Sequence, residues 1–122
     1  MIQDYFEFLQ RLAHSNVLVE EFRLVKEFCG IESGYIRFVV RLVDGSELHV
    51  FEYVDSSLHK KDYSYHWQDR ERRTILRWDN APHHPEIKTF PHHLHEGESV
   101  KESEEMALAV VFKEIERRFE KR

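Results

Sequence analysis

The stretch YIRFVVRLVDGSELHVFEYV, residues 35–54, shows the clearest secondary-structure pattern in this chain of 122 residues. Its first half places apolar side chains at every second position, which is the period of a half-buried β-strand. The Asp44-Gly45 dipeptide that follows is a strong hairpin signal, because glycine accepts the positive φ that tight turns require. Residues 46–54 then return as a second strand, so the stretch predicts an antiparallel hairpin.

The register of this hairpin depends on the length of its turn. A two-residue turn at Asp44-Gly45 places Arg37 opposite Glu52, where the two side chains form a cross-strand charge pair. A bulged turn shifts every pair by one residue. The sequence leaves both registers open.

Three further elements are expected around the hairpin. Residues 2–13 repeat apolar side chains at the spacing of an amphipathic helix. Residues 17–28 fit either a helix closed by Gly30 or an alternating strand, and we favour the strand. Residues 63–68 and 74–78 predict a second hairpin, with an aromatic face in the core and a polar face away from it. That polar face carries Ser64, His66, Gln68, Arg73, Ile75, Arg77 and Asp79.

A last helix is expected before the C-terminus, with Ser99 or Ser103 as its N-cap and acidic residues in its first turn. Its buried stripe comprises Leu108, Val111, Phe112, Ile115 and Phe119. Together the elements predict an α+β fold, an antiparallel sheet of four to five strands with N- and C-terminal helices packed on one face. The length suits a single domain over residues 1–122.

Composition and charge exclude several classes of protein. The net charge of -5 provides no overall basic field, so any contact with nucleic acid requires a local patch. Cys29 is the only cysteine, which excludes an internal disulfide and a cysteine-based zinc ribbon. The apolar runs are far shorter than the roughly 20 residues that span a bilayer, so we expect a cytoplasmic protein with no membrane contact.

Five of the nine histidines lie in residues 79–95, DNAPHHPEIKTFPHHLH. Imidazole titrates near neutral pH and is the commonest neutral metal ligand, so the cluster indicates proton transfer or metal binding. Pro82, Pro85 and Pro91 fix their own φ angles and push the preceding residues towards extended conformations. We therefore expect the imidazoles on a stiff, irregular connection.

Three interpretations of this segment remain open. In the first, two imidazoles act as acid and base on a phosphodiester, a guanidinium stabilises the developing charge, and no metal is needed. The candidates for this site are His66, Arg77, Asp79 as a hydrogen-bond acceptor that orients an imidazole, His83, His84, His92 and His93. In the second, His93 and His95 bind a metal such as zinc together with His83 or His84. In the third, the histidines and prolines only fasten a long connection.

The sequence also contains strings that resemble a known family. Residues 63–69 read YSYHWQD, residues 77–85 read RWDNAPHHP and residues 90–93 read FPHH. With the turn at residues 44–46, this pattern resembles the TumE family of toxin–antitoxin proteins. The resemblance implies a small prokaryotic toxin that is encoded beside a helix-turn-helix antitoxin and neutralised by it. The family motif commonly has a lysine between its last two histidines, where this chain has Leu94.

We therefore expect a toxin-like component of a toxin–antitoxin pair that acts on RNA as a metal-independent ribonuclease. The antitoxin is its expected protein partner, and no cofactor is required. The ribonuclease assignment rests on histidine chemistry and on analogy with other small toxins, not on the family resemblance. The alternative is a non-catalytic module that binds a partner or zinc, with His83, His93 and His95 as candidate ligands.

Overall fold

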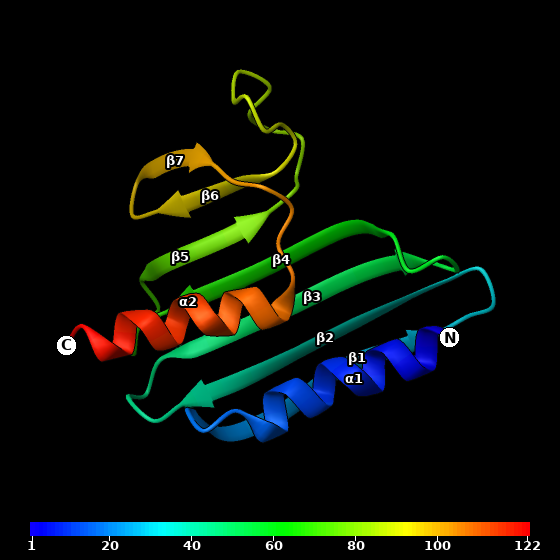
Figure 1. The fold of residues 1–122 in the computed structure, drawn as a ribbon, viewed down its shortest axis with the longest axis horizontal. Helices are drawn as coiled ribbons and strands as arrows, with labels where there is room; N and C mark the ends of the chain where they lie inside the picture. The colour runs from blue at the N-terminus through cyan, green and yellow to red at the C-terminus, as the bar shows by residue number, and fades with distance from the viewer.

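The computed structural model describes residues 1–122 and contains one antiparallel sheet with two helices on one of its faces (Figure 1). The helices are α1 (Ile2–Ser15) and α2 (Leu108–Glu120). The strands are β1 (Val19–Cys29), β2 (Ser33–Leu42), β3 (Glu47–Asp55), β4 (Lys60–Gln68), β5 (Thr74–Asp79), β6 (His93–Glu96) and β7 (Ser99–Glu102). The expected α+β class is confirmed, and so is the strand favoured over residues 17–28. The expected four to five strands fall short of the seven observed.

The strands follow one another across the sheet in the order of the sequence. Helix α1 packs against β1 and β2, and α2 lies near β4, where the ring of Phe119 stacks on Trp67 with centroids 6.2 Å apart. The expected stripe of α2 packs into the core, with four of its residues fully buried and Phe119 at its margin. Neither helix is long and apolar enough to cross a membrane.

The turn between β2 and β3 contains a bulge. Gly45 has a φ of +86°, and the backbone N–H of Leu42 donates to the carbonyl of Ser46 across a loop longer than two residues. The observed register therefore pairs Arg37 with Phe51. Because a shift of one residue exchanges the two faces of a strand, Phe51 leaves the core and Glu52 enters it.

The expected charge pair between Arg37 and Glu52 is therefore wrong. Glu52 is fully buried and accepts hydrogen bonds from the hydroxyls of Tyr5 at 2.5 Å and Tyr65 at 2.6 Å. Burial raises the pKa of Glu52, although both hydrogen bonds and the nearby Lys60 favour its ionised form.

The β4–β5 hairpin also differs from the expected register, but by two residues. His66 pairs with Arg77 instead of Ile75. An even shift leaves each side chain on its expected face, because strand side chains alternate with a period of two. The aromatic residues of this hairpin are accordingly buried in the core: Tyr63, Tyr65, Trp67 and Trp78.

The largest difference lies after the histidine segment. His93–Glu96 and Ser99–Glu102 form a hairpin, with Gly97 at a φ of +59° opening its two-residue connection. The expected N-cap at Ser99 or Ser103 is therefore wrong, because Ser99 pairs in β7 and α2 begins only at Leu108. The backbone N–H of Ser103 donates to Thr89 Oγ1 at 2.9 Å, which ties the chain before α2 to the histidine segment.

Replacement of Glu52 tests the buried carboxyl. Because burial raises the pKa of Glu52 in the folded chain, this group stabilises the fold below its unfolded pKa, and that stability is lost as the pH rises through the folded pKa. We expect the stability of Glu52→Gln relative to that of the wild type to increase from pH 5 to pH 8, as measured by urea unfolding. Glu52→Leu, which leaves two tyrosine hydroxyls unpaired, should cost about 1–3 kcal/mol.

The exposed Glu98 in the turn between β6 and β7 provides the control. Glu98→Gln should leave the shape of the pH profile as in the wild type. A Glu52→Gln profile parallel to that of the wild type would show that Glu52 ionises normally.

Candidate functional site

The sheet face opposite the helices carries two neighbouring rows of side chains from β2 to β6, because directly paired residues point to the same side. One row consists of Arg37, Phe51, Ser64, Asp79 and His93. The other row consists of Val39, His49, His66, Arg77 and His95. Strand pairing therefore places histidines and arginines from distant parts of the sequence on one surface.

Asp79 is the centre of the polar contacts on this face. Its side chain is only 5% exposed, and Arg77 Nε lies 3.1 Å from Oδ2 in an ion pair. The backbone N–H of Ala81 donates to Oδ1 at 3.0 Å. Nε2 of His93 lies 3.0 Å from Oδ1, and Nε2 of His95 lies 3.7 Å from Oδ2. Asp79 is thus within reach of two imidazoles, and its role in orienting one of them stays a prediction.

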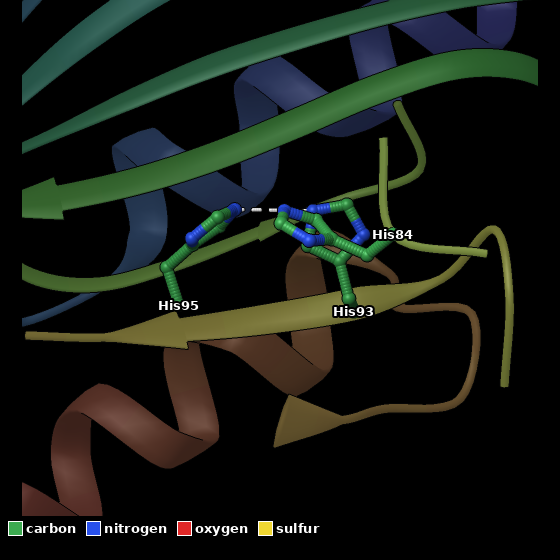
Figure 2. A group of neighbouring side chains, drawn as sticks. All are labelled: His84, His93 and His95. Carbon is green, nitrogen blue, oxygen red and sulfur yellow. Dashed lines mark hydrogen bonds between the residues drawn. The ribbon is translucent and has the colours of Figure 1, made fainter. Parts of the chain in front are cut away.

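Three imidazoles converge beside Asp79. Figure 2 shows His93 and His95 projecting from β6 and His84 approaching from the preceding connection. One ring nitrogen from each histidine can be chosen so that all three atoms lie within 4.8 Å of one another. The rings meet edge to face, with centroid distances between 4.8 and 5.6 Å. Three nitrogen ligands in this arrangement are able to hold a metal ion.

The hydrogen bonds of His93 constrain where its protons lie. Its Nδ1 is 2.9 Å from the carbonyl oxygen of Pro91, which only accepts, so Nδ1 carries a proton. Its Nε2 faces Asp79 Oδ1 and, at 3.1 Å, Nε2 of His95. The Asp79 carboxylate offers a lone pair, and Nε2 of His95 offers a lone pair or a proton according to its tautomer. Nε2 of His93 therefore carries a second proton, accepts one from His95, or shares a cation with both neighbours.

Two histidines of the second row have lowered pKa values. Burial lowers the pKa of His66, and the positive charge of Arg77 lowers it further. Burial also lowers the pKa of His95, whereas the nearby Asp79 carboxylate acts in the opposite direction. Both imidazoles therefore favour the neutral form, in which one ring nitrogen carries a lone pair that can accept a proton or bind a metal.

A pocket of about 260 Å³ lies next to the histidines on the same face. Its walls include Arg37, Phe51, Arg77 and Asp79. The guanidinium carbon of Arg37 lies 4.4 Å from the centroid of the Phe51 ring. The pocket thus combines two cationic side chains and an aromatic surface with the carboxylates of Asp62 and Asp79.

Most of the residues expected from the sequence lie in this group, and two do not. His66, Arg77, Asp79, His84 and His93 line the histidine-bearing face together with His95. His83 is exposed, and His84 instead of His83 joins the three-histidine group. His92 faces away from it, with Nδ1 2.8 Å from the hydroxyl of Tyr63 and Nε2 3.9 Å from Glu105.

Arg37 and Phe51 were not expected at the site. The bulged register of the first hairpin, one of the two alternatives, would have placed them opposite each other on the polar face. Leu94 lies between the two histidines of β6 but points to the opposite face, where it packs against the core. A side chain at position 94 therefore does not share a surface with His93 and His95.

Comparison with known proteins gives one match. A model of the family described as Toxin TumE matches residues 7–119, which is most of the chain. No curated protein and no solved structure matches the chain.

Removal of the Asp79 charge tests how much the site depends on this carboxylate. Asp79→Asn retains an oxygen that can accept from Ala81, but leaves Arg77 and the imidazoles without a counter-charge. We expect a loss of about 2–4 kcal/mol in the free energy of unfolding in urea at pH 7. His83→Ala, an exposed change four residues along the chain, should stay within about 0.5 kcal/mol of wild type. Equal stability of the two variants would contradict a central role for Asp79.

Proposed function

This chain belongs to the TumE family of toxins, and we propose that it acts by cleaving RNA on the histidine-bearing face of its sheet. Membership of a toxin family implies an antitoxin partner. We infer further that this partner is a helix-turn-helix protein and that both act in the cytoplasm, as the resemblance of the motifs implies.

The row His66–Arg77–His95 is the observation that carries the proposal. Arg77 pairs with His66 on one side and with His95 on the other. Neighbouring strands lie about 4.8 Å apart, so the backbones of the two histidines stand roughly 10 Å apart with that of Arg77 between them. A phosphate bound at Arg77 would have an imidazole on each side, which is the arrangement that acid–base cleavage of a phosphodiester requires.

The chemistry follows from this arrangement. One imidazole accepts the proton of the ribose 2′-hydroxyl, and the 2′-oxygen then forms a bond to phosphorus. The bond from phosphorus to the 5′-oxygen breaks, and that oxygen takes a proton from the group on the other side. His66 is one of the two groups, and the other comes from the cluster of His84, His93 and His95, in which His95 is next to Arg77. This reaction needs the 2′-hydroxyl and hence RNA, and it requires no metal.

The neighbouring pocket supports RNA as the ligand. Arg77 engages Asp79 through Nε, and its terminal nitrogens provide further donors for phosphate oxygens. Phe51 offers a surface on which a base can stack, and Arg37 adds a second positive charge beside it. These groups supply the cationic donors with which an acidic chain can bind a polyanion, beside the carboxylates of Asp62 and Asp79 that also line the pocket.

RNA cleavage by purified variants tests the proposal. His66→Ala should reduce the cleavage rate about 10²–10⁴-fold, because it removes one proton-transfer group. Arg77→Ala should reduce the rate about 10²-fold or more, because charge on the phosphate is no longer stabilised. His83→Ala and Arg11→Ala are matched controls, since the first is exposed outside the cluster and the second lies on α1, across the sheet. Both controls should cleave at the wild-type rate.

Expression of the same variants in a host that lacks the antitoxin tests the proposal in cells. Wild type and His83→Ala should arrest growth and degrade total RNA, whereas His66→Ala and Arg77→Ala at equal protein levels should do neither. Growth arrest with intact RNA would reject the ribonuclease and direct the search to another target. RNA cleavage that survives both active-site changes would reject the assigned residues.

A further inference from the structure

We propose that His84, His93 and His95 form a binding site for a single transition-metal ion of the Zn²⁺ type. The proposal concerns metal binding and does not rest on RNA cleavage. It starts from the positions of three imidazoles and one carboxylate that approach the same point (Figure 2).

The distances within the group suit a tetrahedral ion. Zinc binds imidazole nitrogen at about 2.0–2.1 Å, so two ligand nitrogens of a tetrahedral site lie roughly 3.3 Å apart. The Nε2 atoms of His93 and His95 are 3.1 Å apart. The full set of three nitrogens spreads over 4.8 Å, so His84 closes the site by a small movement of its ring.

The proton positions favour a cation between the rings. The carbonyl of Pro91 holds the proton of His93 on Nδ1 and leaves Nε2 directed at the group. A backbone carbonyl that fixes the outer nitrogen is the usual support for a metal-binding histidine. When both rings are neutral and carry their protons on Nδ1, Nε2 of His93, Nε2 of His95 and Asp79 Oδ1 bring three lone pairs together. A divalent ion satisfies all three at once.

The scaffold holds two of the ligands firmly. His93 is 2% exposed, and both His93 and His95 belong to a strand that is paired on each side. His84 lies between Pro82 and Pro85, which restrict the backbone next to it. Asp79 lies within 3.0 Å of His93 and is available as an oxygen ligand or as a hydrogen-bond partner. Three imidazoles with one carboxylate suit Zn²⁺, Ni²⁺, Co²⁺ or Cu²⁺ better than Mg²⁺ or Ca²⁺, which prefer oxygen ligands.

A bound ion would change the proton chemistry next to Arg77. It would occupy the lone pair with which an imidazole of the cluster accepts a proton, and a water bound to it would become the proton acceptor on that side. His66 lies outside the metal site and would keep its place across Arg77.

Titration of the whole, metal-stripped chain with Zn²⁺ in a calorimeter tests the site. We expect one Zn²⁺ per chain, with affinity reduced more than about tenfold in His84→Ala and in His95→Ala. His83→Ala and His92→Ala are the controls, because each also removes one histidine but leaves the cluster intact. Their affinity for Zn²⁺ should equal that of wild type. Far-ultraviolet circular dichroism confirms that each variant is folded. His93 is not replaced, because it is buried and its loss would also disturb the fold.

Co²⁺ provides a second readout, because its visible absorption reports the geometry of its ligands. Wild type, His83→Ala and His92→Ala should give the intense bands of tetrahedral Co²⁺, and His84→Ala should lose them. Absence of a stoichiometric site, or equal loss of affinity in the His83 and His84 variants, would overturn the proposal. A metal site without RNA cleavage would reject the ribonuclease alone, whereas cleavage without a metal site would reject this inference alone.

Discussion

The buried carboxylate of Asp79 is the interaction on which the arrangement of the site depends. A charge that is 5% exposed is costly unless it is paired, and this one is paired by groups from three places in the chain. Arg77 lies two residues earlier on the same face, His93 and His95 come from the next strand, and Ala81 begins the following connection. Through Ala81, the same carboxylate fixes the start of the segment that brings His84 to the cluster.

The bulge at Gly45 determines which acidic residue enters the core. With the bulge, Glu52 lies under α1 with Tyr5 and Tyr65, and Phe51 lies on the polar face beside Arg37. With a two-residue turn Glu52 and Phe51 would exchange places, since a shift of one residue moves every side chain of a strand to the opposite face. The pocket would then have a carboxylate in place of its aromatic wall, which would repel a phosphate.

The sequence predicts the central elements well because their periodicity is strong. Helix α1, the strands of both hairpins and the buried stripe of α2 all follow from repeating apolar positions. The hairpin of β6 and β7 was missed because its strands have four residues each and few apolar side chains, while the acidic run after it resembles a helix start. The two-residue shift in β4–β5 shows that pairing partners are harder to predict than faces. The site residues were identified by type, but only the tertiary fold separates His84 from the adjacent His83.

Position 94 shows that the face of the strand on which a motif residue lies decides what its side chain can contact. The lysine that the resemblance of the motifs leads us to expect at this position would stand between two histidines in sequence, and that proximity suggests a phosphate contact. In β6, however, Leu94 faces the groove between β5, β6 and α2, whose lining includes Glu114. A lysine there would lie on the helix side, among Lys113, Glu114, Arg117 and Arg118, and could not reach a phosphate at Arg77 across the sheet. The leucine of this chain therefore belongs to the contact between the sheet and α2, and the histidine-bearing face keeps Arg37 and Arg77.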